Sequence, residues 1–569
     1  MKFKSSSVVI ACGVILSACG GGSSGGGDDS GGGSSISEAA TPYLYFNSAK
    51  VFTFEWSDVE GATYYQLLEN KDGQSGYEVV SDKISAGSEV VEIKVPLFER
   101  LNARYILQSC DDTTCLDSTE ISIDEEVVDS IGYFKAGNAE AGDQFGWSVA
   151  ISDDGSTIAV GATGEDSNEL NEFNNAASGS GAVYIFDYGE YGWVNRAVLK
   201  ALEVESGAAF GSAVSLSGDG STLAVGAYKE NGEDDNFSAG AVHIFTREDL
   251  EWTHSAKLRA DNHGYYDFFG RALSLSGNGT TLAVAAPSED SSATGVNSGP
   301  DNDDALDSGA VYIFQYSGVE WGQEAYLKAS DSNSNMDFGS SVSLSDDGSI
   351  LAVGAIGGHG GRGATYIFSN NGGWAQQQLL TADSARVGDR FGWDVSFSSD
   401  GNLLAVGAPL QAGASEDPDD RDGFNNGAVY LFSYEEDSWY QSAYLKASNT
   451  DEDDAFGTSI SLNNDGSLLA VGAQESSAGI GFYADSTDNS ASRAGAAYMY
   501  SMVDGQWIES TYLKANNTDE RDYFGTSIAL SGDGDTLVVG APEEQGSDTG
   551  IMADPDLNDA DAAGAIYIY

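Results

Sequence analysis

From residue 143 to the end of the chain, apolar and polar positions recur in a fixed order. Each copy begins with Phe-Gly, continues as a short alternating run such as SVSLS, turns at a Gly, and resumes as a second apolar run that ends in Gly-Ala. Alternating runs joined by Asp-Gly predict β-hairpins. A third run of the GAVYIF type follows a variable acidic loop, and a fourth of the YLKA type usually follows a Trp. Each copy therefore predicts four antiparallel strands.

The number of copies follows from the Phe-Gly pairs, whose phenylalanines are spaced by 53 to 69 residues. Self-similarity at such a period predicts a solenoid or a propeller, and four antiparallel strands per copy are typical of a propeller blade. The sequence thus predicts an all-β fold with a seven-bladed β-propeller over residues 131–569. The seven phenylalanines are Phe145, Phe210, Phe269, Phe338, Phe391, Phe456 and Phe524.

The two ends of the array are complementary. The last copy stops at Tyr569, at the end of its third run, and lacks a fourth. A run of the missing type, residues 133–136 with the sequence YFKA, precedes the first Phe-Gly. We expect this N-terminal strand, within residues 131–136, to complete the seventh blade and close the ring, which hides the strand edges of an open sheet.

These motifs resemble the FG-GAP repeat of integrin α-subunit propellers, and more closely that of bacterial FG-GAP repeat proteins. Two copies carry a full Gly-Ala-Pro, at residues 407–409 and 540–542, and the third copy has Ala-Ala-Pro at 285–287. The resemblance covers about residues 131–569. It implies a seven-bladed propeller used for recognition, as in cell adhesion.

Residues 1–18 are typical of a signal peptide, because Lys2 and Lys4 precede an apolar run that is too short for a permanent membrane span. The sequence LSAC at 16–19 resembles the bacterial lipobox, which implies that Cys19 is lipidated; an ordinary cleaved signal is the alternative. By the same analogy, Gly20 favours the outer membrane. Residues 19–40 are rich in Gly and Ser and predict a flexible tether.

Residues 41–128 alternate without Phe-Gly and predict a small β-sandwich. The segments FTFEWSDVEGATYYQLLEN and NARYILQSC resemble strands of a fibronectin type III-like domain, with Trp56 as the core aromatic residue. Cys110 and Cys115 form a C-x4-C pair that predicts a disulfide in an oxidising compartment, with free thiols as the alternative.

The charge is strongly negative, with 25 Lys and Arg against 89 Asp and Glu and a net charge of −64. Such a chain repels nucleic acid, which we exclude as a partner. The acids concentrate in loops that follow the second and fourth strands of the blades, so we expect one strongly negative loop face. These acidic stretches are residues 165–175, 229–236, 300–307, 416–422, 449–454, 517–522 and 554–561.

Calcium is the cofactor that such loops would suit, since Asp and Asn supply hard oxygen ligands; a solvated acidic surface is the alternative. The hairpin turns do not fit the integrin calcium motif, because Ala150 and Ile158 stand at the first and last ligand positions around the first turn. An Asp two residues before Phe either ligates a cation or bonds backbone N–H groups in an Asx-type turn, and we favour the turn. It occurs as Asp143, Asp267, Asp389, Asp454 and Asp522.

Catalytic motifs are absent from the sequence: there is no H-E-x-x-H, no G-x-S-x-G and no Walker loop. The four histidines are scattered, and His243 takes the Tyr position of GAVYIF, which favours a packing role. We therefore expect no enzyme and assign no catalytic residue.

The sequence as a whole favours a lipid-anchored outer-membrane protein, on the cell surface or the periplasmic face, that binds a protein or glycan ligand through its acidic loop face. One alternative is a polysaccharide-acting propeller enzyme, whose mark would be convergent carboxylates and an aromatic platform in the propeller mouth. Another is a structural scaffold of an outer-membrane assembly. The ligand and the oligomeric state are not encoded in any motif.

Overall fold

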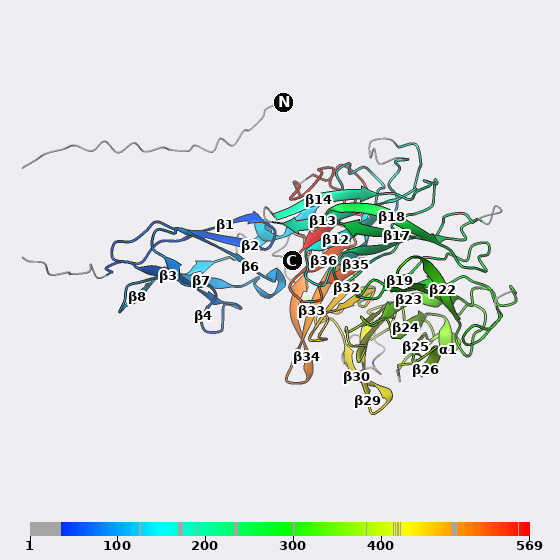
Figure 1. The fold of residues 1–569 in the computed structure, drawn as a ribbon. Helices are drawn as coiled ribbons and strands as arrows, with labels where there is room; N and C mark the ends of the chain where they lie inside the picture. Colours follow the sequence, from blue (N-terminus) through cyan, green and yellow to red (C-terminus); the bar gives the residue numbers. More distant parts are fainter. Residues whose placement is uncertain are drawn as a thin grey trace, which may run out of the picture.

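The computed structural model describes residues 36–569, apart from 124–126, 169–174, 190–191, 233–236, 300–301, 383, 414, 416, 418–419, 421–422, 481–485 and 556. The predicted signal peptide, Cys19 and most of the predicted tether lie outside these residues. An N-terminal module lies beside a larger propeller (Figure 1). The helical elements of the described chain are three short turns, η1 (Leu97–Glu99), η2 (Val127–Ser130) and α1 (Gly358–Gly361), so the all-β prediction is confirmed. None of the described helices is long and apolar enough to cross a membrane.

The N-terminal module consists of two antiparallel sheets that share one core. Phe52 and Phe54 of the first sheet contact Tyr105 of the second, and Trp56 packs on Tyr65 with ring centroids 5.2 Å apart. Trp56 is therefore a core residue, and the fibronectin type III-like identity stays a prediction. The first sheet contains β1 (Tyr43–Ser48), β2 (Val51–Glu55) and β6 (Val90–Lys94); the second contains β3 (Tyr64–Asn70), β4 (Glu78–Val79), β5 (Ile84–Ser85), β7 (Arg104–Cys110), β8 (Cys115–Asp117) and β9 (Ile121–Ser122).

The propeller consists of seven four-stranded antiparallel sheets, which we number as blades 1 to 7. Blades 1 to 3 contain β11 (Phe145–Ile151), β12 (Thr157–Ala162), β13 (Ala182–Gly189) and β14 (Gly192–Leu199); β15 (Val214–Leu216), β16 (Thr222–Ala227), β17 (Ala241–Glu248) and β18 (Glu251–Leu258); and β19 (Leu273–Leu275), β20 (Thr281–Ala286), β21 (Ala310–Tyr316) and β22 (Trp321–Leu327). Blades 4 to 6 contain β23 (Phe338–Leu344), β24 (Ile350–Ala355), β25 (Ala364–Asn370) and β26 (Trp374–Leu380); β27 (Val395–Phe397), β28 (Leu403–Ala408), β29 (Ala428–Glu435) and β30 (Ser438–Leu445); and β31 (Ser459–Leu462), β32 (Leu468–Ala473), β33 (Ala496–Val503) and β34 (Gln506–Leu513). Blade 7 contains β35 (Ser527–Leu530), β36 (Leu537–Ala541), β37 (Ala565–Ile568) and β10 (Gly132–Phe134).

The seventh blade joins the two ends of the array. β10 pairs antiparallel with β37, with Tyr133 opposite Tyr567. The first strand of blade 1 packs against β35 and β36, and the Ser527 hydroxyl donates to the Gly146 carbonyl at 2.8 Å. The ring is therefore closed by a strand that precedes all the other propeller strands in sequence.

The recurring Phe-Gly and Gly-Ala motifs have a common physical cause at the joints between blades. Phe145 packs edge-on against Tyr184 of its own blade, with centroids 5.3 Å apart, while its backbone pairs with Gly564 of the preceding blade. Gly564 has φ +81°, and a Cβ there would lie 2.1 Å from the Phe145 carbonyl oxygen. Only glycine fits this approach, because any side chain would collide with backbone.

The hairpin turns between the first and second strands of the blades are joined by a closed ring of backbone hydrogen bonds. This ring lies on the face opposite to the loops that follow the second strands. In six of the seven turns, the backbone N–H of the residue after the leading Ser or Asn donates to a backbone carbonyl of the next blade at 2.8 to 3.0 Å. The seventh bond, from the Asp533 N–H to the Asp153 carbonyl, is offset by one residue and returns to the first blade. The ring residues are Asp153, Gly218, Gly277, Asp346, Ser399, Asn464 and Gly532.

The N-terminal module is docked on the propeller at this hairpin-turn face and along the outer strand of blade 6. The side chain of Lys50 is fully buried and donates to the Asp535 carbonyl and, at 2.7 Å, to the Thr536 hydroxyl. Burial lowers the pKa of Lys50 to about 7. Thr511 of blade 6 donates to the Phe98 carbonyl at 2.8 Å. These contacts fix the module to one side of the ring.

Candidate functional site

A funnel lies on the propeller axis, with a volume of about 560 Å³. Pro287, Ile356 and Gln474, which follow second strands, lie at its mouth, so it opens on the face that carries the loops after those strands. We name this the loop face. All seven blades contribute the residue that directly follows Phe-Gly: Trp147, Ser212, Arg271, Ser340, Trp393, Thr458 and Thr526.

Two tryptophans distinguish this funnel from the repeated framework. Of nine Trp residues in the chain, Trp56 belongs to the N-terminal module and six stand at the start of the fourth strands of blades 1 to 6. The remaining two, Trp147 and Trp393, are half-buried in the funnel wall. The residue type that follows Phe-Gly differs between the copies, whereas Phe-Gly itself recurs in every copy. The side chains that line the funnel are therefore not set by the repeat.

Asp394 adds a carboxyl group to the funnel. At the same place in other blades a serine, such as Ser459, donates to a backbone carbonyl of the next blade. Asp394 instead accepts hydrogen bonds from the Ile460 N–H at 2.7 Å and the Val395 N–H at 2.9 Å. Burial raises the pKa of Asp394 to about 7. The side chain is therefore a weakly acidic group that carries its proton over part of the neutral range.

Two arginines flank the funnel although the chain is strongly acidic. The Arg390 guanidinium lies over the Trp393 ring, 5.2 Å from its centroid, and Arg271 lies over Tyr228 at 5.3 Å. Asp337, which also lines the funnel, has its pKa raised by burial. The loop face is thus not uniformly negative: aromatic rings, arginines and carboxyl groups meet at the axis.

The repeated blades of this chain match a known protein family. The FG-GAP repeat model matches residues 132–186, 193–245, 252–314, 321–368, 374–432 and 507–569, which is more than half of the chain. The chain belongs to the FG-GAP repeat family. Each matched segment runs from a fourth strand to the third strand of the next blade, and residues 433–506, between two matches, include β30 to β33 in the same order. No curated protein matches the chain.

Solved structures similar to this FG-GAP protein include two with low sequence identity. The WD40 repeats of RRP9 share 11% identity, with 77% of this chain and 96% of the other covered and a TM-score of 0.43. TolB from Acinetobacter baumannii shares 12% identity, with 73% and 80% covered and a TM-score of 0.29.

The five aspartates that precede Phe-Gly are not gathered into one site. Each accepts a hydrogen bond from the backbone N–H three residues before it, at 2.5 to 2.9 Å, within its own inter-blade crossing. All five are buried. In the part of the chain that the structure describes, no three His, Cys, Asp or Glu side chains are arranged to hold a metal ion. Asp143, Asp267, Asp389, Asp454 and Asp522 therefore fit the turn role.

A substitution at Asp522 tests this role through pH. Burial raises its pKa from 3.8 to about 8, so its contribution to stability is present below pH 4 and is lost as the pH rises through 8. We expect Asp522→Asn to raise Tm by a few degrees at pH 8.5 and to leave it unchanged at pH 4, measured by calorimetry. The control is Asp465→Asn, because hydrogen bonds from Ser467 lower the pKa of Asp465 and the substitution should not stabilise. A lower Tm for Asp522→Asn at pH 8.5, seen only when Ca²⁺ is present, would instead assign Asp522 as a cation ligand.

Buried ion pairs tie the acidic loops of the FG-GAP propeller to its fourth strands. Lys200 contacts Glu165 at 2.6 Å, and Lys328 contacts Glu289 at 2.7 Å. In blade 7, Lys135 contacts Glu544 at 2.5 Å. Burial lowers the pKa of all three lysines. Glu165, Glu289 and Glu544 are thus structural, and not part of a solvated surface.

His243 is buried on β17, as a packing residue would be. Its Nδ1 lies 3.0 Å from Nε2 of His254 and its Nε2 lies 2.8 Å from Glu230. His254 was not predicted to lie beside His243, because the two residues are brought together only by the pairing of β17 with β18.

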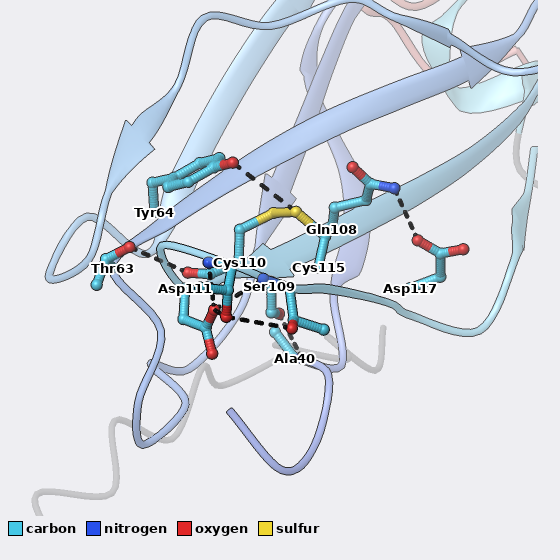
Figure 2. The surroundings of a disulfide bond; sticks show 11 residues. Ala40, Thr63, Tyr64, Gln108, Ser109, Cys110, Asp111, Cys115 and Asp117 are labelled. Carbon is cyan, nitrogen blue, oxygen red and sulfur yellow. Dashed lines mark hydrogen bonds between the residues drawn. A yellow bond between two sulfur atoms is a disulfide. The ribbon is translucent and has the colours of Figure 1, made fainter. Parts of the chain in front are cut away.

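The tether side of the N-terminal module lies away from the propeller. Cys110 and Cys115 form a disulfide between β7 and β8, at the end of the module far from the ring (Figures 1 and 2). Next to it, the Ile36 N–H donates to Asp111 and the Ala40 N–H donates to the Ser109 hydroxyl at 2.9 Å. The first described residues are therefore held at the end of the molecule opposite to the ring.

Proposed function

We propose that this protein is a lipid-anchored binding protein of the bacterial outer membrane that holds a glycan in the axial funnel of its propeller. The observation that carries the proposal is the pair Trp147 and Trp393, the two propeller tryptophans outside the repeated framework. They line one funnel together with hydroxyl, carboxyl and arginine groups. Aromatic faces next to convergent polar groups suit sugar rings, which present C–H faces and hydroxyl edges. A volume of about 560 Å³ lies in the usual range for small-ligand pockets.

The position of the anchor supports presentation of the loop face. The predicted lipid site at Cys19 precedes Ile36, which lies at the far end of the module, and the module is docked on the hairpin-turn face through Lys50. A membrane attached through the tether would therefore lie on the side opposite to the funnel. The funnel would be open to ligands that approach from away from the membrane.

A glycan array tests the binding function with the full-length protein in detergent. We expect Trp147→Ala and Trp393→Ala each to weaken binding by tenfold or more, since truncation of a central aromatic residue costs about 2 kcal/mol or more. The matched control is Trp321→Ala, a framework tryptophan on the outer strand of blade 3, which should bind as the wild type does. Equal binding by all four proteins, or a protein ligand in place of a sugar, would overturn the glycan proposal.

A second candidate function is hydrolysis of the bound glycan. Asp394 and Asp337 line the same funnel as the two tryptophans, and a carboxyl with a pKa of about 7 suits a general acid. An Asp394→Asn protein that binds like the wild type but no longer releases reducing sugar ends would favour the enzyme. Binding without any release by the wild type would exclude it.

A further inference from the structure

The joint between blades 2 and 3 departs from the repeat on the loop face. Four repeat positions belong to each joint: the residue directly after the second strand, the residue four before the third strand, and the residues one and three before the next Phe-Gly. At this joint all four are aromatic: Tyr228, Phe237, Phe268 and Tyr266. The same positions at the other six joints hold two aromatic residues in total, Phe424 and Tyr523. The aromatic residues are therefore a feature of this joint and not of the repeat.

The four aromatic residues lead outward from the axial funnel. Arg271, which lines the funnel, lies over the Tyr228 ring at 5.3 Å from its centroid. Tyr228 contacts Phe268 edge-on with centroids 5.6 Å apart, and Phe268 contacts Tyr266 at 6.2 Å. The Tyr266 N–H then donates to the Phe237 carbonyl at 2.9 Å. We name Tyr228, Phe268, Tyr266 and Phe237 the aromatic track.

The outer half of the aromatic track is open to solvent. Phe237 is 55% exposed and Tyr266 is 56% exposed, and the neighbouring Tyr265 is 57% exposed. Single exposed apolar residues are common on soluble proteins and need no explanation, but adjacent ones mark a surface that binds something. Tyr228 and Phe268 are half-buried and join this exposed part to the funnel.

The backbone at Tyr266 shows that this position does not favour an aromatic residue. Its φ is +61°, in the left-handed region that Gly, Asn and Asp adopt most readily. Five of the other six joints carry one of these three residue types there: Gly142, Gly207, Asn335, Gly388 and Asp453. Tyr266 is thus better explained by what its side chain contacts than by the turn that it occupies.

We propose that the glycan site of the funnel continues along the aromatic track, so that the ligand is a neutral linear polysaccharide running outward between blades 2 and 3. This inference rests on the proposed function, because the track begins at Arg271 in the funnel wall. The ring spacings of 5.6 and 6.2 Å are close to the length of one sugar unit, so successive units of a chain can each meet a ring. The net charge of −64 repels polyanions and favours a neutral chain.

Affinity electrophoresis of the full-length protein in detergent tests the substrate class. Native gels contain pullulan, mixed-linkage β-glucan, glucomannan or xylan, and the four matching trisaccharides are titrated by calorimetry. We expect at least one polysaccharide to retard the wild type and to bind at least tenfold more tightly than its own trisaccharide, which fills the funnel alone. Retardation by none of the four would overturn the linear glycan as the occupant of the track.

Two variants locate the additional affinity on the track. Tyr266→Ala and Phe237→Ala remove exposed side chains, so the fold is kept, and each should weaken polysaccharide binding at least fivefold while trisaccharide binding stays unchanged. The matched control is Phe424→Ala, at the same repeat position as Phe237 in blade 5. Its carbonyl accepts from the Asp453 N–H at 2.8 Å, so no aromatic residue stands in the place of Tyr266, and binding should be unchanged.

Trp147→Ala separates the failure of this inference from the failure of the funnel. It should weaken the binding of polysaccharide and trisaccharide alike. Weakening by Trp147→Ala together with unchanged polysaccharide binding in both Tyr266→Ala and Phe237→Ala would contradict the track and leave the funnel in place. A wild type that binds neither the polysaccharides nor the trisaccharides would contradict both.

Discussion

Gly564→Ala is expected to destabilise the propeller by about 2–5 kcal/mol, the sum of left-handed backbone strain and a collision with backbone. The added Cβ would lie 2.1 Å from the Phe145 carbonyl oxygen, at the joint where the last blade meets the first. Neither partner can move freely, because Phe145 packs on Tyr184 in the core of blade 1. Denaturant unfolding followed by tryptophan fluorescence measures the loss.

Gly505→Ala is the matched control for this substitution. Gly505 has φ +80°, nearly the value of Gly564, but a Cβ there meets no atom within 4 Å. The control should therefore lose only the backbone strain of about 1–2 kcal/mol. Equal losses in the two variants would contradict a close joint between blades 7 and 1.

Lys135→Met is expected to lower the free energy of unfolding by about 3–5 kcal/mol, because it leaves the buried carboxylate of Glu544 without its cation. The Lys135 and Glu544 side chains are 0% and 1% exposed. Lys135 directly follows β10, so the pair fastens the closing strand to the loop of blade 7. The same unfolding measurement applies.

The control for the ion pair is Lys514→Met. Lys514 occupies the same repeat position in blade 6, but it donates to the Gly479 carbonyl and faces no glutamate in an ion pair among the described residues. The substitution should therefore cost clearly less than Lys135→Met. A similar cost at both positions would show that the loss comes from packing of the lysine stem and not from the stranded charge.

Local patterns were enough to predict most of the propeller. The alternation of apolar residues and the Asp-Gly turns specify strands without reference to distant residues, and the unpaired run at 133–136 predicts which strand closes the ring. The patterns recur in every copy because each blade needs the same packing contacts, such as that of Phe145 on Tyr184. This recurrence is what allowed the strands to be predicted.

The candidate sites were harder to predict, because they consist of departures from the repeat. Trp147 and Trp393 both directly follow a Phe-Gly pair, which is visible when the seven copies are aligned. They line the same funnel only because the blades close into a ring. The docking of Lys50 on Thr536 joins residues almost 500 positions apart, and no local pattern encodes it.

Photo-crosslinking in intact cells tests the central claim most directly. A benzophenone amino acid placed at position 212 or 458 lies in the funnel and leaves both tryptophans in place, and one at position 321 lies on the outer strand of blade 3. The account predicts that the first two positions capture the same saccharide-containing product and that position 321 does not. Capture from position 321 alone, or no capture from the funnel, would contradict a ligand site on the propeller axis.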